Sequence, residues 1–571
     1  MTQTGQISTF TFKICGKAGD GSMATGELFY KLAQKLGYFV FDYREYPSAI
    51  RGGVATFQAT ASAEKGYSQK RKLDVLLMLD IKSGQRHIPE LKKEGTIIFD
   101  EKEKIELSRN SKYKVFSLPF SEIVDDIGAL PITKNTVAAG ALCAYLSIDL
   151  KYVLESIEDQ FSSKGNEVVE MNKKAAKNGY GIAKNKLNGD KVELKPGTAK
   201  NQIIISGNEA SALGAIKAGC KFYAAYPMTP TTGVLHYLAN KGPDFEMIVK
   251  QAEDEISVIN MALGASFAGL RSMVSTSGGG FALMVEALGM SGMTETPLVI
   301  IMGSRGNPST GMPTWTEQSD LNHVLYSGQG EFPRIVIAPG DQEEMFYLTA
   351  AAFNWADIYQ LPVIVLTDKY LAESRATVDR FEQNLIKIDR GKIERGPTEG
   401  YKRYEITKDG ISPRAFPGSG PGLVVANSDE HNEFGYTSEK ARNRVKQMNK
   451  RMIKLKKAGN EMPKPEIFGP EEAEKTIISW GSTKGPILEA MKKLENVKYL
   501  HLNIIWPFPR EAVHDALKNS KEVVLIENNF TSQLGDLIRQ QTGTYIEKRL
   551  LKYDGRAFYP EEIVKFIKKV K

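Results

Sequence analysis

Residues 222–232 read FYAAYPMTPTT, an apolar run that passes directly into a loop of hydroxyl groups and prolines. The run has the composition of a buried strand, and the two prolines end it. Three similar transitions follow, at Gln251–Glu255, at the glycine-rich turn Ser275–Gly280 and at Gly303–Gly306. Because the carboxyl ends of parallel strands meet at one edge of an open sheet, we expect these four turns to form a site.

Length and composition indicate a globular protein of several domains. The chain has 571 residues, of which 42% are hydrophobic and 25% charged, whereas one domain typically takes about 150 residues. A net charge of +7 is small for this length and is explained by solvated lysines, so nucleic acid is only a weak alternative partner. No apolar run approaches the roughly 20 residues that span a bilayer, and Met1–Gln6 lacks the features of a signal peptide. We therefore expect a cytoplasmic protein without a membrane partner.

The three cysteines, Cys15, Cys143 and Cys220, lie far apart and have no histidine at ligand spacing. This spacing supports neither a disulfide framework nor a zinc or iron–sulfur site. We expect no metal in this chain.

The N-terminal residues predict a strand, a glycine loop and a helix. Phe10–Cys15 is the strand, Gly16–Ser22 the loop and Met23–Leu36 the helix. Free amides at such a helix start suit an anion such as phosphate, although a tight turn alone explains the glycines equally well. Further alternation of strands and helices up to about residue 190 predicts an open α/β sheet. The Lys- and Asn-rich run Lys173–Lys200 is interpreted as an exposed linker.

This glycine loop allows two specific interpretations. Gly19-Asp20-Gly21 resembles the start of a thiamine diphosphate metal motif, but the first asparagine of the chain is Asn110. The oxygen ligand that completes a Mg²⁺ site is missing at the required spacing, so we reject this motif. A dinucleotide loop requires GxGxxG, which Gly16–Gly21 does not match. Asp42 nevertheless follows the loop by about the 20 residues at which such a motif has its acidic residue. A nucleotide-dependent dehydrogenase is kept as an alternative.

The second unit, residues 200–380, continues the α/β alternation. A helix of small residues is expected at Gln251–Gly269, after a strand at Glu246–Lys250. Asp341–Ile358 is predicted to be a structural helix, because Asp341 can cap it and two glutamates occupy its first turn.

The remaining chain divides into an irregular region and a C-terminal domain. Residues 381–470 are rich in proline, glycine and charge, and contain a basic helix at Lys440–Lys457. Its apolar residues recur at helical spacing at Val445, Met448, Met452 and Leu455. We expect them to pack against a neighbouring element, and a contact with a partner subunit or acidic surface is the alternative. Residues 471–571 predict a compact α/β domain.

Several motifs together resemble one family. They are YPMTP at 226–230, EDE at 253–255, NMALGA at 260–265, TSGGG at 276–280, RGNPSTGMPT at 305–314 and ENN at 527–529, with the glycine loop at 16–21 and RGG at 51–53. The chain resembles the alpha subunit of 2-oxoacid:ferredoxin oxidoreductases in the form that carries the family's gamma domain fused ahead of the alpha part. The resemblance extends over nearly the whole chain.

The resemblance implies a multidomain α/β fold. It consists of an α/β gamma domain at 1–190, a pyrimidine-type thiamine diphosphate-binding domain at 200–380, a linking region at 381–470 and a transketolase-C-like α/β domain at 471–571. It further implies that a separate beta subunit supplies the diphosphate and Mg²⁺ site and a [4Fe-4S] cluster. The reaction implied is CoA-dependent oxidative decarboxylation of a 2-oxoacid with ferredoxin as electron acceptor, or the reverse carboxylation, in an (alpha-beta)₂ assembly.

A thiamine enzyme needs a carboxylate at the aminopyrimidine ring, and two glutamates are candidates. In the family resembled, the catalytic glutamate precedes a helix glycine at a fixed distance, and Glu255 with Gly264 matches that distance. The choice is therefore Glu255, with Glu253 as its competitor. Each could equally be an acidic residue of a helical first turn. The cofactor-binding residues implied by the resemblance are Tyr226, Pro227, Glu253, Ser277 and Gly278.

The carboxylate of a 2-oxoacid needs a cationic partner, and arginine can bind it with two hydrogen bonds. Arg305 resembles the family's carboxylate-binding arginine, and Thr229 its hydroxyl partner; without the resemblance they would be a surface charge and a turn residue. Met228 replaces the usual isoleucine of the loop, a change of similar volume. Residues Gly330–Asp341 look most like 2-oxoglutarate-using members. Pyruvate, branched-chain 2-oxoacids and a non-catalytic scaffold remain alternatives.

Overall fold

The computed structural model describes residues 7–48, 53–108, 111–187 and 190–570. The chain forms two compact units. Unit 1 comprises Met1–Ile205, Ser374–Arg380 and Tyr559–Glu561, and unit 2 comprises Ser206–Glu373, Phe381–Phe558 and Glu562–Lys571. Most of the motif RGG at 51–53 lies outside the described residues. The four-part domain division stays a prediction.

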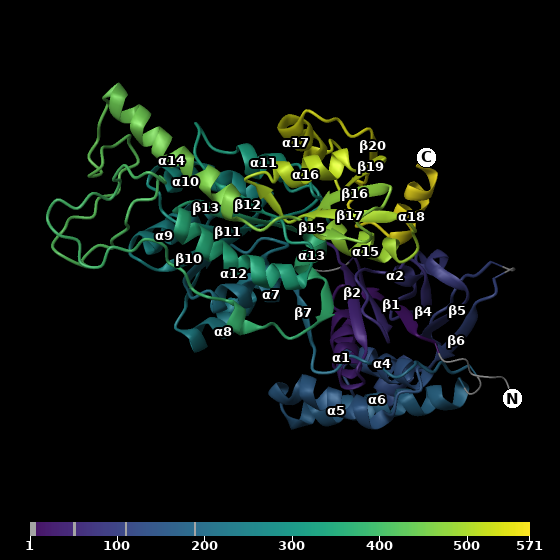
Figure 1. The fold of residues 1–571 in the computed structure, drawn as a ribbon. Coiled ribbons are helices and arrows are strands. Elements are labelled where there is room, and N and C mark those ends of the chain that lie inside the picture. The colour runs from purple at the N-terminus through teal and green to yellow at the C-terminus, as the bar shows by residue number, and fades with distance from the viewer. Residues whose placement is uncertain (1–6, 49–52, 109–110, 188–189, 571) are drawn as a thin grey trace. The chain divides into compact units, whose positions relative to one another are not determined.

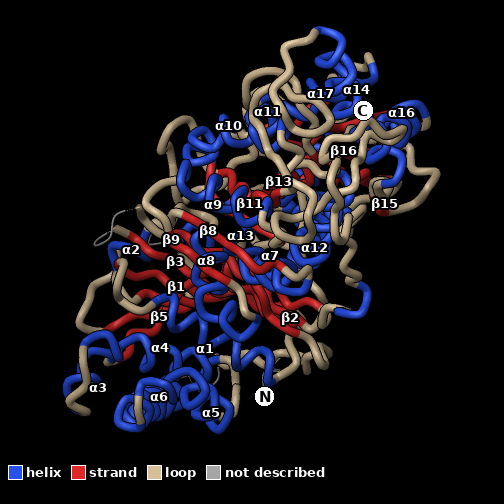
Figure 2. Tube along the Cα trace, turned by 90° about the vertical axis from the view of Figure 1, so that its left-hand side faces the viewer, coloured by secondary structure: helices blue, strands red, loops and turns tan. Residues whose placement is uncertain are grey.

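Unit 1 is built on a sheet of eight strands in the order β6-β5-β4-β1-β3-β2-β14-β7. Its strands are β1 Thr9–Lys17, β2 Phe39–Glu45, β3 Val54–Ser62, β4 Leu73–Met78, β5 Leu91–Asp100, β6 Lys114–Leu118, β7 Ile203–Ser206 and β14 Arg375–Val378. Its helices are α1 Ser22–Lys35, α2 Ile81–Gln85, α3 Phe120–Asp126, α4 Lys134–Tyr145, α5 Leu150–Phe161 and α6 Asn166–Lys186. Helices α1, α4, α5 and α6 cover one face of this sheet (Figures 1 and 2). The predicted strand, glycine loop and helix at the N-terminus are confirmed.

The linker predicted at Lys173–Lys200 is wrong over its first half, because helix α6 continues to Lys186. Its buried face consists of small residues that pack closely on α4. A Cβ atom at Gly140 of α4 would clash with the carbonyl oxygen of Ala176, and one at Gly179 would clash with that of Val137. The lysines of the run lie on the other side of a helix whose small residues permit this approach.

Unit 2 contains a central sheet in the order β18-β12-β13-β11-β10-β8-β9. Its strands are β8 Cys220–Ala225, β9 Ile248–Gln251, β10 Arg271–Ser277, β11 Leu298–Ser304, β12 Ile335–Ile337, β13 Pro362–Asp368 and β18 Ile504–Trp506. Side chains of β11 alternate between two cores: Ile300 packs with residues of α9 and α10, and Val299 with residues of α7 and α12. Both faces of the sheet are therefore buried, as expected for parallel strands.

The helices of unit 2 surround this sheet and the C-terminal strands. They are α7 Gly207–Lys217, α8 Thr232–Lys241, α9 Glu255–Phe267, α10 Gly278–Met293, α11 Leu321–Tyr326, α12 Gln342–Tyr359, α13 Lys369–Glu373, α14 Ala441–Glu461, α15 Lys484–Met491, α16 Arg510–Lys518, α17 Gln533–Thr542 and α18 Pro560–Lys569. The predicted cap of α12 is confirmed, since the Asp341 side chain accepts a hydrogen bond from the amide of Glu344 at 2.8 Å. Among all described residues, no helix is both long and apolar enough to cross a membrane.

Two predicted boundaries near the four turns are corrected. Gln251 belongs to strand β9 rather than to the following helix, which begins at Glu255. The predicted glycine turn at Ser275–Gly280 is divided, because β10 runs to Ser277 and α10 begins at Gly278. The three glycines thus form the first helical turn.

The C-terminal residues form a five-stranded sheet in the order β15-β17-β16-β19-β20. Its strands are β15 Glu466–Phe468, β16 Lys475–Trp480, β17 Val497–Leu502, β19 Glu522–Glu527 and β20 Lys548–Leu551. The segment from Val497 to Trp506 is divided between two sheets. After β17, strand β18 pairs antiparallel with β12 of the central sheet, with Val336 opposite Trp506.

The predicted packing of the basic helix is also wrong. Helix α14 buries Gln447, Lys450, Arg451, Lys454 and Ala458, whereas Val445 is 59% exposed. Charged groups occupy the buried face because buried carboxylates face them. The ammonium group of Lys450 donates to both oxygens of Glu295 at 2.6 and 2.8 Å, and Lys454 pairs with the same carboxylate.

Candidate active site

The four predicted turns lie at one end of the central sheet. Strands β8, β10 and β11 are parallel neighbours, with Ala225 opposite Ser275 and Ser277 opposite Gly303. Their carboxyl ends therefore occur at similar levels, and helices α9 and α10 begin at the same edge. Tyr226 is exposed at the start of the loop after β8, followed by the exposed Pro227.

The two candidate glutamates differ in their surroundings. Glu253 is exposed and precedes the helix, whereas Glu255 is the first residue of α9 and only 3% exposed. The helix cap is provided by Asp254, whose side chain accepts from the amide of Ser257 at 2.8 Å. The Oε1 atom of Glu255 is buried and has no hydrogen-bond partner among the described residues. A buried carboxylate oxygen in this state needs a donor from outside the protein, such as a ligand, a water molecule or a neighbouring chain.

The Glu255 carboxylate lies directly on the first turn of α10. A Cβ atom at Gly280 would clash with Glu255 Oε1 and with Thr276 Oγ1. Nearby, the buried Oγ atom of Ser277 has no partner within the described part of the chain. The hydroxyl of Thr276 lies 3.9 Å from the sulfur of Met228, so the methionine of the YPMTP loop is part of this site.

Arg305 and Thr229, which lie far apart in the sequence, are in contact. Nη1 of Arg305 donates to the backbone carbonyl oxygen of Thr229 at 2.8 Å. Arg305 is 7% exposed, and burial lowers the pKa of its guanidinium group. Its buried Nε has no partner among the residues described. The guanidinium group is thus oriented by one carbonyl and retains donors for a ligand.

Residues on both sides of Arg305 are anchored by a carboxylate that the sequence did not single out. Asp320 is 6% exposed and accepts from the hydroxyl of Ser304 at 2.6 Å. Its two oxygens also accept from Nδ2 of Asn307, each at 2.7 Å. A Cβ atom at Gly278 would be only 3.1 Å from Asp320 Oδ1, so this pair lies against the start of α10. Asp320 follows a long irregular segment, and no spacing rule could have identified it.

The ENN motif of the C-terminal residues supports the same loop. The backbone N–H of Gln318 donates to the carbonyl oxygen of Asn528 at 2.8 Å, and the side-chain Oε1 of Gln318 accepts from the backbone N–H of Asn528 at 3.0 Å. Asn529 donates from Nδ2 to the carbonyl oxygen of Gln318 at 3.1 Å. This motif therefore connects the loop after β11 to the C-terminal sheet.

The features of unit 1 do not provide the dinucleotide site of the dehydrogenase alternative. Asp42 is fully buried, where it accepts from the amide of Arg375 at 2.5 Å and from Nε of Arg44 at 3.0 Å. Its two oxygens are therefore already bound within the protein. The three cysteines are free and buried, and burial raises the pKa of each thiol to about 12. Among the described residues, no group of three or more His, Cys, Asp or Glu side chains is arranged to hold a metal.

Three family profiles match consecutive parts of the chain. Residues 11–182 match "Pyruvate ferredoxin/flavodoxin oxidoreductase", and residues 213–450 match "Pyruvate flavodoxin/ferredoxin oxidoreductase, thiamine diP-bdg". Residues 473–563 match "Pyruvate:ferredoxin oxidoreductase core domain II". The candidate site therefore lies in the part of the chain, residues 213–450, that matches the thiamine diphosphate-binding domain of the family.

Curated relatives match over the full length. A 2-oxoacid:ferredoxin oxidoreductase alpha subunit from a Sulfolobus species is 34% identical, with 98% of this chain and 96% of the relative covered. The 2-oxoglutarate oxidoreductase subunit KorA of Mycobacterium tuberculosis is 30% identical, with coverages of 99% and 92%.

A solved structure has the same fold. It is described as 2-oxoglutarate:ferredoxin oxidoreductase from Magnetococcus marinus with 2-oxoglutarate, coenzyme A and succinyl-CoA bound. The match is 34% identical, has a TM-score of 0.92 and covers 99% of this chain and 100% of that one. The predicted multidomain α/β fold class and the predicted family are confirmed. The chain belongs to the alpha subunits of the 2-oxoacid:ferredoxin oxidoreductases, a family of multi-subunit enzymes.

Proposed function

We propose that this chain is the alpha subunit of a 2-oxoglutarate:ferredoxin oxidoreductase, which forms succinyl-CoA from 2-oxoglutarate and CoA or catalyses the reverse carboxylation. The observation that carries the proposed role of the site is the buried, unpartnered Oε1 of Glu255. A 2-oxoglutarate preference is supported by the names of two full-length matches, those from Mycobacterium tuberculosis and Magnetococcus marinus.

The residues at the sheet edge fit the aminopyrimidine part of thiamine diphosphate. Glu255 Oε1 and Ser277 Oγ are both buried without partners in the described chain, and together they offer a carboxylate and a hydroxyl to a polar ring. When bound, thiamine diphosphate supplies the carbanion that attacks the 2-oxo carbon. Glu255 would hold a proton at the pyrimidine ring nitrogen, and Tyr226, Pro227, Glu253 and Gly278 stay proposed cofactor contacts.

Arg305 would bind the carboxylate next to the keto group. One of its donors is held by the Thr229 carbonyl, which leaves Nε and Nη2 for the substrate. A charged, buried guanidinium binds a carboxylate strongly because water does not compete for its donors. The hydroxyl of Thr229 stays a proposed second contact.

The proposed partners are those implied by the way the family divides the active site between alpha and beta subunits. A beta subunit would supply the diphosphate and Mg²⁺ site and the [4Fe-4S] cluster, ferredoxin would accept electrons, and two alpha and two beta chains would assemble. The exposed Tyr226 and Pro227 support a site that is completed by another chain. A cytoplasmic location stays a prediction.

Pyruvate is the second candidate substrate, because all three matching family profiles carry pyruvate in their descriptions. The deciding experiment is co-expression with a beta subunit of the same family, followed by CoA-dependent ferredoxin reduction with 2-oxoglutarate, pyruvate and a branched-chain 2-oxoacid. We expect the highest kcat/KM with 2-oxoglutarate. A preference for pyruvate would replace the proposed substrate but keep the family reaction.

The role of Glu255 is tested in the same complex. Glu255→Gln should lower kcat at least about 100-fold, typical of losing a positioned acid–base group, and Glu253→Gln, at the competing glutamate, should have the smaller effect. Equal activity of wild type and Glu255→Gln would refute the catalytic assignment and favour a scaffold role.

A further inference from the structure

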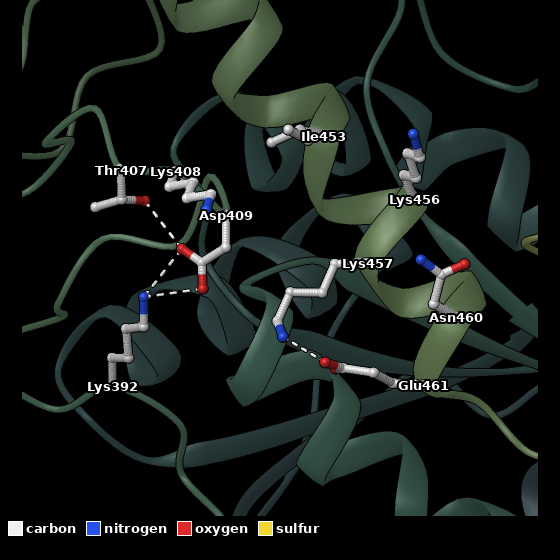
Figure 3. Close-up of a pocket in the computed structure, with 9 residues that line it drawn as sticks. All are labelled: Lys392, Thr407, Lys408, Asp409, Ile453, Lys456, Lys457, Asn460 and Glu461. Carbon is white, nitrogen blue, oxygen red and sulfur yellow. Dashed lines mark hydrogen bonds and ion pairs between the residues drawn. The ribbon is translucent and has the colours of Figure 1, made fainter.

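A cavity of about 610 Å³ lies in unit 2, lined by residues of the region 381–470 rather than by those of the candidate active site. Four lysines, two carboxylates, a threonine, an asparagine and one isoleucine line it (Figure 3). Its volume is in the range of small-molecule sites, about 300–1,000 Å³. Charged and polar residues predominate among those that line it, so a charged ligand is expected.

Two of the four lysines are already paired with the carboxylates. Lys392 donates to both oxygens of Asp409 and to the carbonyl oxygen of Ile411, each at 3.0 Å, which uses all three of its hydrogens. Burial alone would raise the pKa of Asp409, but the hydrogen bond from Lys392 holds it below its usual range. Lys457 pairs with Glu461 one helical turn later. Figure 3 shows both pairs as dashed lines.

The other two lysines come from different walls of the cavity. Lys408 is exposed on the turn Thr407–Gly410, and Lys456 is exposed on helix α14 (Figure 3). Neither has an ion-pair partner in the part of the chain that the structure describes. Asn460 lies one turn after Lys456 and adds an amide to the same wall. With the other charges paired, these two ammonium groups give the cavity an excess of two positive charges.

The walls of the cavity are fixed before any ligand binds. A Cβ atom at Gly410, where φ is +75°, would clash with the carbonyl oxygen of Lys450, so the turn packs directly on α14. Helix α14 is in turn held by the buried pair of Lys450 with Glu295 at 2.6 Å. The backbone on both sides of the cavity is therefore held in place, which reduces the ordering that a ligand must cause there.

We propose that this cavity binds a small, non-aromatic molecule that carries two separated oxyanion groups. One group would bind Lys408, and the other Lys456 together with Asn460. Among the residues that the structure describes, none that lines the cavity is aromatic and Ile453 alone is apolar, so a nucleotide base would find no ring to stack on. Short dicarboxylates and bisphosphates share the required chemistry. The proposal does not depend on the proposed substrate.

The test is isothermal titration calorimetry on the assembled alpha–beta complex. Succinate represents the dicarboxylates and fructose 1,6-bisphosphate the bisphosphates, while inorganic phosphate provides one anionic centre only. We expect one of the first two probes to bind with one site per alpha chain and more tightly than phosphate. Binding of succinate would identify the ligand as a dicarboxylate, and binding of fructose 1,6-bisphosphate would identify it as a bisphosphate.

The double variant Lys408→Ala with Lys456→Ala should weaken that binding at least about tenfold, since two charge-assisted contacts are lost. The matched control is Lys446→Ala with Lys464→Ala, which removes the same charge from exposed lysines outside the cavity. We expect the control to bind as wild type and both variants to keep full 2-oxoacid oxidation. Absence of binding for all probes, tightest binding of phosphate, or equal weakening in the control would overturn the proposal.

Discussion

Arg305 donates from Nη1 to the backbone carbonyl oxygen of Thr229 at 2.8 Å, which joins the loop after β8 to the end of β11. One side of the guanidinium group is therefore occupied by the protein, and the rest is available for a carboxylate. Lysine has the same charge but cannot satisfy the carbonyl and bind a carboxylate in the same fork geometry.

We therefore expect Arg305→Lys to raise the KM for the 2-oxoacid at least about tenfold, because a charge-assisted hydrogen bond contributes about 1.5–3 kcal/mol. Steady-state ferredoxin reduction measures this change. The apparent affinity for thiamine diphosphate in the same assay is the control and should stay unchanged. An unaltered KM would mean that another group binds the substrate carboxylate.

Alanine substitutions at the neighbouring residues Gly280 and Gly279 should affect kcat very differently. Gly280→Ala places a methyl group against Glu255 Oε1 and Thr276 Oγ1, whereas a Cβ at Gly279 would have no atom of another described element within 4 Å. Overpacking of this kind costs about 1–3 kcal/mol, and it would displace the carboxylate that we propose to be catalytic. We expect Gly280→Ala to reduce kcat strongly and Gly279→Ala to leave it near wild type. Similar activities of both variants would show that the position of Glu255 is not critical.

Glu295 should make stability depend on pH in the acid range. Burial alone would raise the pKa of Glu295, but the ammonium groups of Lys450 and Lys454 hold it below the usual range. In the unfolded chain the pKa of a glutamate is about 4.3. Below that value the unfolded state binds a proton that the folded state does not, so stability falls with falling pH.

We expect Glu295→Gln to lose about 3–5 kcal/mol at pH 7, because two buried ammonium groups are left without their carboxylate. The variant should also show a weaker loss of stability between pH 5 and about pH 3 than wild type, since the titrating group is absent. Denaturant unfolding across this range measures both effects. Parallel pH profiles would show that Glu295 does not contribute to acid unfolding.

Glu527 is fully buried and begins the ENN motif. Its carboxylate accepts from the backbone amides of Leu534 and Gly535 at 2.9 and 3.0 Å, at the start of α17. Glu527→Gln replaces one of the two acceptor oxygens by an NH₂ group, which cannot accept from a backbone amide. The substitution should therefore destabilise the protein by at least about 2 kcal/mol. Thermal unfolding is the measurement, and the exposed Glu547→Gln is the control. Equal melting temperatures would show that the amide satisfies these donors equally well.

The position of the candidate site could be predicted from the sequence because its signals are local. Prolines and glycines end the strands at Ala225 and Ser277, and parallel strands bring such ends together. Spacing favoured Glu255 over Glu253, but the difference in their exposure could not be predicted, since it depends on how α9 packs on α10. The anchoring role of Asp320 depends on hydrogen bonds across an irregular loop, which no periodicity encodes.

The two wrong predictions about helices α6 and α14 have a common physical origin. Composition suggested that Lys173–Lys186 is exposed linker, but a stripe of alanine and glycine makes it a packed helix. Hydrophobic periodicity suggested the wrong buried face for α14, because Glu295, about 150 residues earlier, pairs with Lys450 and Lys454. In both cases the determining partner is distant in the sequence.

Strand β18 makes the C-terminal residues part of the fold of the central sheet. Its pairing of Ile504 with Ile337 continues a sheet whose other strands lie between residues 220 and 368. A chain shortened before residue 471 would expose the edge of β12, which is a template for pairing with other chains. Proteolysis or truncation in the linking region should therefore yield aggregation-prone fragments rather than two independent modules. The central sheet becomes complete only when the last fifth of the polypeptide has been synthesised.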